Sequence, residues 1–583
     1  MTKDLAGREV VQVVEIEQPF CSLVYGNNPC TAQGTDDKKC YNTYATCQDQ
    51  DNFAASTLSL YFTRGNVADQ NISGVTYAIP SLVSVSTSPT RINLSSANKS
   101  ASGLGNRASV KIKFKDHPHT DKRVDPYVDG RSWDPYLRAS FWSKWFARNR
   151  YRQNITVKVY EGYEGEALGA MTVREYVWDS FTGPDADGNV VVTAKDILAK
   201  VEERKALAPV ASPGKLHTNI ASGTSHVECN SATESDYPAT GTLRIGSECM
   251  TYTSRANSAN GVTFSGLTRG TDGTTASSHS AGDTAQQCLR YTTQRTDDVL
   301  ADLLENYAGI PSTKLDTANW ATEYDSFSPS VTLTALITKP TGVNQLVSEI
   351  SEQSSSYIWW DERDALVKFK VISGLNVAPD ILTEESHILD GSLSFRDLPD
   401  QRVSQAWVYY LLDDVTRSIT DAENWKAIQI SADLNAEGDN EYGEKSVREI
   451  FARWLPSDAL AVPLANRTLT RYVDVPREAR FRLDAKDRTY WTGDTVRLST
   501  DMEVDAFGER RQATYTIIQA EEVVPGEVVE YMAISATAFG KIYRIMAAGS
   551  GDYPGAATAG YTDAYIGNSA GVLSDGEICA RIT

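Results

Sequence analysis

The sequence lacks long apolar runs and the motifs of the common enzyme classes. No uncharged apolar stretch is long enough to cross a bilayer, so we expect a protein without a membrane anchor. The first ten residues contain no apolar segment of the kind found in secretory signals, so we expect a chain made and kept in the reducing cytosol. The motifs G-x-S-x-G and H-E-x-x-H, Walker loops and nucleotide-binding glycine loops are absent too, which argues against an enzyme.

Basic residues are too few to balance the acidic ones. The 583 residues include 76 Asp and Glu against 56 Lys and Arg, a net charge of −20. This argues against nucleic-acid binding as the main function, because phosphate groups are bound by Lys and Arg. Residues 111–152 are the exception, with eleven Lys and Arg against five Asp, a local net charge of +6 that leaves −26 for the rest. We expect these cations to pair with carboxylates of the chain itself or of a neighbouring subunit.

Cysteine is scarce overall but concentrated near the start of the chain. Four of the eight cysteines are Cys21, Cys30, Cys40 and Cys47, with 8, 9 and 6 residues between them. Because a cytosolic chain does not rely on disulfides, clustered thiols favour a metal centre. The gaps are wider than the paired C-x(2–4)-C knuckles of a zinc ribbon, and four thiolates on long loops suit an iron–sulfur cluster. The spacing alone leaves open a cluster, a zinc site, and disulfides or unpaired thiols.

Short stretches of alternating polarity are numerous, and tyrosine (28) far outnumbers methionine (6), so we expect a mainly β, multidomain protein with some α+β segments. Residues 109–115 alternate strictly and predict a half-buried strand. Helices are predicted at 141–149, at 193–204, after Thr296 and after Thr341, and a hairpin at 357–371. Strands dominate from about 395 to 540 and are predicted to close into a barrel.

Residues 221–288 have a different composition, with 23 Ser and Thr among 68 residues and short strands separated by Gly turns. We interpret them as a small inserted β-domain, whose two ends should lie close together because the body of the protein resumes at Leu289. Cys229, Cys249 and Cys288 lie in or beside this segment. We expect buried thiols there, with a disulfide between two of them as the alternative.

Three other groups of side chains could form a functional site, but we expect a structural role for each of them. They are His117 and His119 with Asp116 and Asp121; the carboxylates Asp361, Glu362 and Asp364; and Trp142, Trp145, Trp359 and Trp360. The first group resembles a metal site, but it lies on a proline-containing loop that its hydrogen bonds are expected to anchor. The carboxylates suggest a glycosidase pair, but they share one hairpin turn. The tryptophans are expected to be core residues rather than a carbohydrate platform.

Several of these motifs resemble proteins of long-tailed phages. The cysteine pattern, ending Cys47-Gln-Asp, resembles the iron–sulfur module of tail-tip proteins of the lambdoid minor tail protein L type. The resemblance extends to Phe114-Lys-Asp-His-Pro-His-Thr-Asp, Val159-Tyr-Glu-Gly-Tyr, Ile245-Gly-Ser-Glu-Cys-Met-Thr-Tyr-Thr, Leu267-Thr-Arg-Gly-Thr-Asp-Gly-Thr and His279-Ser-Ala-Gly-Asp. It covers roughly residues 10–545 and is only architectural towards the C-terminus.

The resemblance implies a structural baseplate hub protein of a phage tail, located in the virion and assembled in the host cytoplasm. It implies a homotrimeric ring around the channel for DNA ejection, in contact with the distal tail protein, the tape measure protein and the central fibre, and with DNA only in transit. Cys21, Cys30, Cys40 and Cys47 would bind a [4Fe–4S] cluster, with zinc as the alternative metal. An acidic channel wall would repel phosphate groups. The alternative function is a receptor-binding tail adhesin, although the insertion offers it few aromatic residues (Tyr237, Tyr252 and Phe264).

The predicted division of the chain has six parts. They are an iron–sulfur cysteine module (1–58), a first hub-type β-barrel (59–210), the inserted small β-domain (211–288), an α+β hub domain (289–394), a second hub-type β-barrel (395–546) and a C-terminal tail (547–583).

Overall fold

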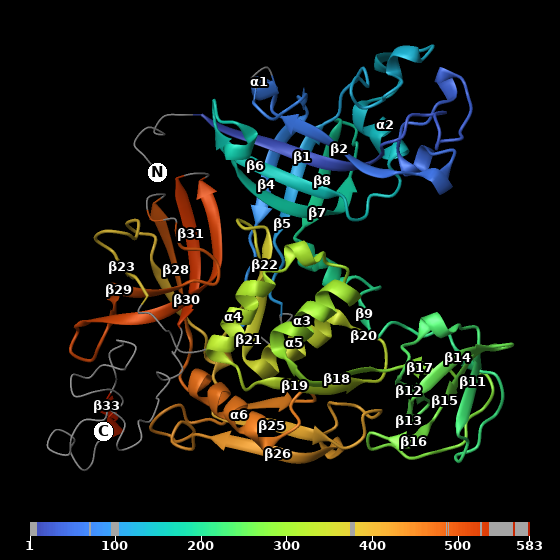
Figure 1. Ribbon diagram of the computed structural model, residues 1–583. Coiled ribbons are helices and arrows are strands. Elements are labelled where there is room, and N and C mark those ends of the chain that lie inside the picture. The colour runs from blue at the N-terminus through green and yellow to red at the C-terminus, as the bar shows by residue number, and fades with distance from the viewer. Residues whose placement is uncertain are drawn as a thin grey trace, which may run out of the picture.

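The computed structural model describes residues 9–68, 72–94, 104–372, 379–484, 487, 489–524 and 527–535, and the short strand pair β32 (Ala564–Tyr565) and β33 (Arg581–Ile582). The predicted tail at 547–583 otherwise lies outside the described residues. The fold is mainly β and multidomain: one sheet lies at the top of Figure 1, a second at its left, a helix-containing unit in the centre and the insertion at the right. None of the described helices is long and apolar enough to cross a membrane.

The first sheet has eight strands in the order β3-β2-β1-β6-β7-β8-β5-β4. Its strands are β1 (Val10–Cys21), β2 (Ala55–Thr63), β3 (Ala78–Ile79), β4 (Leu82–Ser88), β5 (Ser109–Lys115), β6 (Thr156–Tyr163), β7 (Thr172–Thr182) and β8 (Asn189–Lys195). In β5 the side chains of Val110, Ile112 and Phe114 are buried and those of the lysines are partly or fully exposed, so the predicted alternation is confirmed.

Strand pairing does not complete the predicted closed barrel within the described residues, although the edge strands β3 and β4 are joined by only two residues and their edges lie near each other. Within the described residues β3 pairs only with β2, and β4 only with β5. Helix α2 (Phe141–Arg148) packs Phe141, Trp142 and Trp145 against the inner side chains of the sheet. These aromatic rings share one core with Ile79 and Leu82 of the two edge strands, so side-chain packing rather than strand pairing connects the two edges.

The cysteine loop, residues 22–54, is an excursion of this sheet. It leaves at the end of β1 and returns at β2, and these two strands pair antiparallel from Val13–Thr63 to Cys21–Ala55. The predicted boundary at residue 58 would cut this pairing, so the sheet begins at β1 and the loop is its appendage (top right in Figure 1).

The insertion consists of two four-stranded sheets. Their orders are β10-β11-β15-β14 and β16-β13-β12-β17, built from β10 (Lys215–Leu216), β11 (His226–Asn230), β12 (Gly241–Ile245), β13 (Glu248–Tyr252), β14 (Ser254–Ser258), β15 (Gly261–Ser265), β16 (Thr268–Thr271) and β17 (Gln286–Gln287). One apolar core lies between them. Lys215 bridges Thr284, and the Ala285 amide donates to the Gly214 carbonyl at 3.0 Å, so the two ends lie side by side as predicted.

The central unit combines three separate parts of the chain around one core. Its elements are β9 (Leu207–Ala208), β18 (Leu289–Arg295), α3 (Thr296–Asp302) with a π-helical turn (Leu303–Tyr307), α4 (Thr317–Phe327), β19 (Thr332–Ile337), β20 (Thr341–Gly342), α5 (Val343–Ser354), β21 (Ser356–Asp361), β22 (Leu366–Val371), β25 (Gln405–Leu412), β26 (Trp425–Ala432), β27 (Val447–Phe451) and α6 (Asp458–Tyr472). The helices predicted after Thr296 and Thr341 and the hairpin β21–β22 are confirmed.

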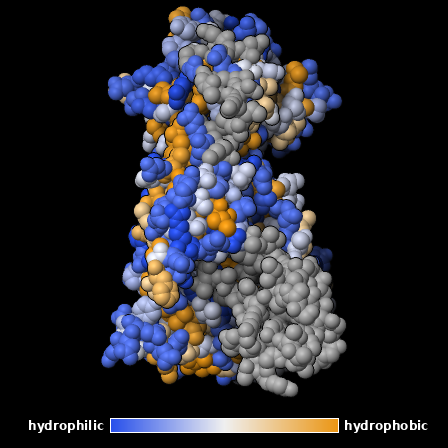
Figure 2. All heavy atoms as spheres, turned by 90° about the vertical axis from the view of Figure 1, so that its left-hand side faces the viewer, coloured by the Kyte–Doolittle hydropathy of each residue, from blue (hydrophilic) through white to orange (hydrophobic). Residues whose placement is uncertain are grey.

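The second sheet has six strands in the order β23-β29-β30-β31-β28-β24. They are β23 (Ile381–Thr383), β24 (Ser394–Asp397), β28 (Arg477–Asp484), β29 (Thr495–Val504), β30 (Arg510–Val524) and β31 (Val528–Ser535). The predicted barrel over 395–546 differs from this in two ways. The sheet is open within the described residues, and 402–472 pack into the central core because Ala406, Val408, Ile450 and Trp454 face α3 and α5 rather than the sheet. Figure 2 shows the molecule from the left-hand side of Figure 1, where the second sheet lies. On this face the described surface is mainly hydrophilic, with hydrophobic residues in separate groups.

Candidate metal centre

The four clustered cysteines near the start of the chain line one cavity. Cys21 ends β1, and Cys30, Cys40 and Cys47 lie on the cysteine loop. The cavity holds about 290 Å³ of space free of atoms, part of it open to solvent. Its other lining residues are Leu23, Tyr25, Asn42, Asp49, Asn52 and Phe53. The structure thus brings together all four thiols singled out in the sequence.

Asn42 holds the start of the loop against its middle. This residue has a positive φ of 53° and is 5% exposed. Its side-chain amide donates to the carbonyls of Cys21 (2.9 Å) and Leu23 (3.0 Å), while its own carbonyl accepts the Cys21 amide at 2.7 Å. The Cys40 thiol lies 3.5 Å from Asn42 Oδ1. Asparagine tolerates this left-handed conformation, and here it fixes Cys21 close to Cys40.

Asp49 connects the other two cysteines. One of its carboxylate oxygens accepts the amide of Thr31 at 2.6 Å and its hydroxyl at 3.0 Å, directly after Cys30. The Asp49 amide in turn donates to the Cys47 sulfur at 3.4 Å. These hydrogen bonds hold the Asp49 carboxylate and keep its pKa below the ordinary value. The segments around Cys30 and Cys47 are therefore held together without a hydrophobic core of their own.

The thiols Cys40 and Cys47 have raised pKa values. Burial is the main cause in both, and the neighbouring cysteines raise the pKa of each thiol further because adjacent thiolates repel one another. Hydrogen bonding from Asn42 and from the Asp49 amide acts in the opposite direction. Four thiolates in this space therefore need positive charge among them, which metal ions supply.

Cysteine thiolates are the donors that both iron–sulfur clusters and structural zinc sites use. Within the described ranges, no three His, Cys, Asp or Glu side chains are arranged to bind one metal ion. A four-iron cluster binds each cysteine at a different iron, so its four sulfurs stand farther apart than four sulfurs on one zinc ion. The cavity offers four soft thiol donors, the ligand type that such a cluster uses, with the Asp49 carboxylate also in its lining.

The basic segment 111–152 packs against the cysteine loop and its cations pair inside the chain. The Asp121 carboxylate accepts Lys144 at 2.7 Å and Arg148 at 2.6 Å, and Asp125 accepts Arg131 at 2.9 Å. The expected pairing with the chain's own carboxylates is confirmed for these residues. The Thr43 hydroxyl also donates to the Arg148 carbonyl at 2.7 Å, which ties the loop to the end of α2.

The histidine pair anchors its loop. His119 Nδ1 accepts the Asp121 amide at 2.9 Å, and the His117 ring stacks on Phe141 with 6.0 Å between ring centres. Burial would raise the pKa of Asp121, but the neighbouring His119 ring and the cations Lys144 and Arg148 hold it at about 2. These contacts agree with the predicted anchoring role.

The three carboxylates of the hairpin turn accept backbone hydrogen bonds within the turn or form ion pairs. Asp361 accepts the amides of Arg363 and Asp364, and Asp364 pairs with Lys368 at 2.9 Å. Glu362 is 6% exposed and lies 3.9 Å from Arg174 of β7. The same arginine contacts Glu161 at 3.1 Å and Glu522 of β30 at 2.5 Å, so it joins the first sheet, the central unit and the second sheet.

The remaining candidates lie in the core. Trp142, Trp145, Trp359 and Trp360 are at most 5% exposed, as predicted. Cys229, Cys249 and Cys288 are buried free thiols. Cys249 and Cys288 pack together against Leu336, and their mutual hydrogen bond and burial raise the pKa of Cys288.

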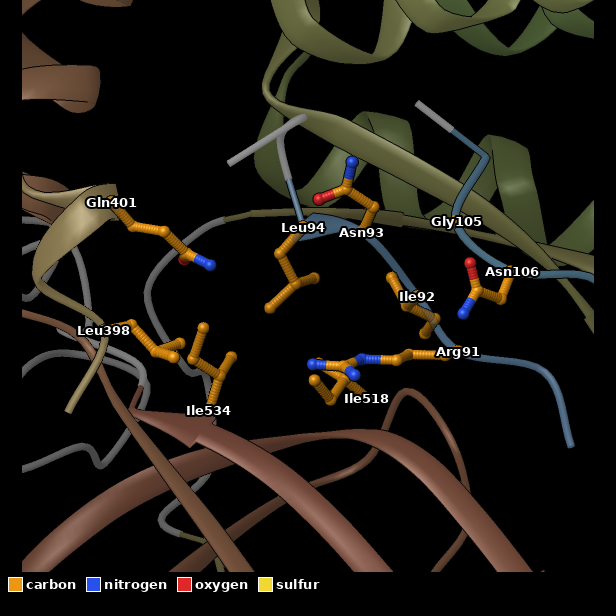
Figure 3. A pocket seen from close by; sticks show the side chains of 10 residues that line it. All are labelled: Arg91, Ile92, Asn93, Leu94, Gly105, Asn106, Leu398, Gln401, Ile518 and Ile534. Atoms are coloured by element: carbon orange, nitrogen blue, oxygen red, sulfur yellow. The ribbon is translucent and has the colours of Figure 1, made fainter. Parts of the chain in front are cut away.

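A second cavity lies between the connection from β4 to β5 and the second sheet, and its lining has no catalytic set of side chains (Figure 3). It holds about 520 Å³ of space free of atoms, part of it open to solvent. Its lining is mostly apolar side chains and backbone, such as Ile92, Leu94, Ile518 and Ile534. The one charged lining residue, Arg91, pairs with Glu478 at 2.9 Å.

Comparison with known proteins gives remote similarities only. No family model and no curated protein matches the chain. The 43 kDa tail protein of prophage MuSo2 from Shewanella oneidensis is 9% identical, with a TM-score of 0.36 over 79% of this chain and 99% of that one. A tail protein from Neisseria meningitidis MC58 is 9% identical, with a TM-score of 0.35 over 78% and 98%. A chain of a gene transfer agent virion is 13% identical, with a TM-score of 0.28 over 41% and 46%.

Proposed function

We propose that this chain is a structural protein of a phage tail tip that holds a [4Fe–4S] cluster on Cys21, Cys30, Cys40 and Cys47. The observation that carries the proposal is that these four thiols line a single cavity although they are spread over the 27 residues from Cys21 to Cys47. Their spacing and the neighbouring motifs resemble the tail-tip module, and the packing of the basic segment against the loop links the two resembling regions in space.

The cluster would act as a structural group. Few apolar side chains of the cysteine loop are buried, Tyr25 and Ala32 among them. Such a loop gains folding free energy when its ligands bind metal, because the ordered loop exists mainly in the bound state. Bound there, the cluster would cross-link the loop at four points, while Asn42 and Asp49 hold the ligand segments in place.

We further propose the assembled form that the resemblance implies: a homotrimer in the tail baseplate that encloses the channel for DNA and contacts the distal tail, tape measure and central fibre proteins. The net charge of −20 supports this proposal, since a negatively charged wall does not retain DNA. The adhesin alternative is weakened further, because the few aromatic residues of the insertion, Tyr237, Tyr252 and Phe264, are at most 3% exposed and so offer no aromatic surface for a glycan.

Anaerobic purification tests the cluster. We expect about four irons per chain, from the stoichiometry of the cluster, and absorbance near the visible range that dithionite bleaches. Cys40→Ser should lose both, while Cys229→Ala, which removes a buried thiol outside the cavity, should retain them. Stoichiometric zinc without iron, or an iron content unaffected by Cys40→Ser, would refute the proposal.

Native mass spectrometry of the purified protein tests the assembly. A trimer is the expected mass. A monomer that persists when the protein is mixed with its neighbouring tail proteins would contradict the ring.

A further inference from the structure

Arg131 is a cation enclosed between the basic segment and the cysteine loop. It follows the short 3₁₀ helix Val128–Gly130, and its side chain is fully buried. The guanidinium carbon lies 4.5 Å from the centre of the Tyr41 ring and 5.7 Å from that of Trp133. A buried arginine keeps its charge, so it is stable here only if its donors are satisfied.

All five N–H donors of Arg131 have acceptors. Two of them reach Asp125, from Nε at 2.9 Å and from Nη2 at 3.1 Å. The other three reach the cysteine loop: Nη1 donates to the carbonyls of Asp36 (2.5 Å) and Lys39 (2.9 Å), and Nη2 to the carbonyl of Cys40 (3.2 Å). Because the five donors lie in one rigid plane, one side chain fixes three loop carbonyls relative to Asp125.

This position directly affects one cysteine of the cavity. The Cys40 carbonyl is held by Arg131, and the Cys40 sulfur lies beside Asn42. The preceding turn, Asp36–Lys38, has no buried residue, so hydrophobic packing does not hold it. It is held by polar contacts to the basic segment, including the Ser132 amide that donates to Asp37 at 2.6 Å.

We propose that Arg131 is the positioning residue that sets Cys40 at the distance and orientation from the other three cysteines that the cluster requires. This inference rests on the proposed function, because it concerns the same cavity. Arg131 does not touch the cavity itself; it acts through the backbone of residues 36–40.

The test compares Arg131→Lys with Arg138→Lys. Lysine keeps the charge but has a compact ammonium group, which cannot serve one carboxylate and three carbonyls in fixed directions. Arg138 lies in the same segment and stacks on Trp133 at 4.3 Å, but its side chain is exposed. Three quantities are measured on the full-length protein purified anaerobically: iron per chain, the rate of cluster loss to an iron chelator, and visible circular dichroism, which reports the geometry of the cysteine ligands.

We expect Arg131→Lys to lose its cluster at least about tenfold faster, the size of effect typical for residues that orient metal ligands, and to change the visible circular dichroism. Arg138→Lys should match the parent protein. Far-ultraviolet circular dichroism and thermal unfolding check that the first sheet remains folded. A folded Arg131→Lys protein with the parent rate and spectrum overturns the inference. Absence of iron from the parent protein overturns the proposed function instead, so the two failures are distinguishable.

Discussion

Substitution Glu248→Gln tests whether the insertion is held together by a buried ion-pair network. Glu248 begins β13 and its side chain is 0% exposed. Arg269 donates to both carboxylate oxygens, from Nε at 2.6 Å and from Nη2 at 2.8 Å, and His279 Nε2 lies 2.8 Å away. The amides of Gly270 (3.1 Å) and Ser277 (3.0 Å) donate to it as well. Glu248, Arg269, Gly270 and His279 belong to the three sequence motifs quoted for the insertion, so the motifs meet in one network.

The magnitude follows from the contacts at one oxygen. Glutamine has nearly the same shape but replaces one carboxylate oxygen by an NH₂ group, which then faces the donors of Arg269 and Ser277. Removing one partner of a buried charge pair costs about 3–5 kcal/mol, because the arginine is left buried without its counter-charge. For a small domain each kcal/mol lowers the melting temperature by about 4–8 °C, so we expect a fall of more than about 10 °C in the unfolding of the insertion.

The assay measures the thermal unfolding of the insertion by monitoring hydrogen exchange at the amides of residues 215–287. Glu228→Gln is the matched control, because Glu228 lies in the same domain and accepts only hydrogen bonds from Ser258 and Asn260. It should leave the midpoint nearly unchanged. The donors of Arg269, Ser277 and His279 lower the pKa of Glu248 to about 2 although burial opposes them. Its contribution is therefore complete above its ordinary value of 4.5 and is lost as the pH falls towards 2. If Glu248→Gln melts like Glu228→Gln at neutral pH, the network does not stabilise the domain.

Three further predictions concern the rest of the chain. Burial raises the pKa of Glu362 to about 7 despite Arg174, so its contribution to stability is greatest below the ordinary value of 4.5 and is lost as the pH rises through 7; Glu362→Gln should flatten the pH dependence of unfolding between pH 5 and 8, and an unchanged slope would contradict this. Arg174→Met should lower the free energy of unfolding in denaturant titrations by about 3–5 kcal/mol, because it leaves three buried glutamates without their shared cation. The control Arg417→Met removes an exposed ion pair with Asp421 and should leave the free energy of unfolding nearly unchanged. Replacing 215–284 by a short Gly/Ser linker should leave iron content and oligomeric mass intact, since the ends already lie side by side; loss of soluble protein would show that the insertion belongs to the core.

Local patterns predicted local structure well. The alternation at 109–115, the helix after Thr341 and the hairpin at 357–371 depend on neighbouring residues, and the structure contains all three. The cysteines could be grouped because a thiol cluster has few explanations in a chain expected to be cytosolic. Helix α6 was missed because Pro463 lies inside it, and the helix predicted at 193–204 is instead the end of β8 followed by a 3₁₀ segment, Ile197–Glu202.

Long-range partners were beyond the sequence. Nothing in 402–472 distinguishes strands that pack into the central core from strands of the second sheet, because both need the same apolar alternation. Arg131 looks like one of eleven cations in a basic segment, and only the structure shows that it alone is fully enclosed by the cysteine loop.

The nested order of the second sheet has a consequence for folding kinetics. Strand β24 pairs with β28, but the segment that connects these two strands in the sequence belongs to the central unit. β24 therefore stays unpaired until β28 has been made and has reached it. Closing a flexible loop of about 80 residues costs about 4 kcal/mol of chain entropy, before any strand contact compensates for it. If β25–β27 and α6 first dock on α3 and α5, the two ends of this segment are already near each other and the closure becomes short. The central unit would then act as the template on which the second sheet assembles during synthesis. Replacing buried apolar residues of α6 by polar ones should therefore slow the folding of the second sheet, although these residues do not touch it.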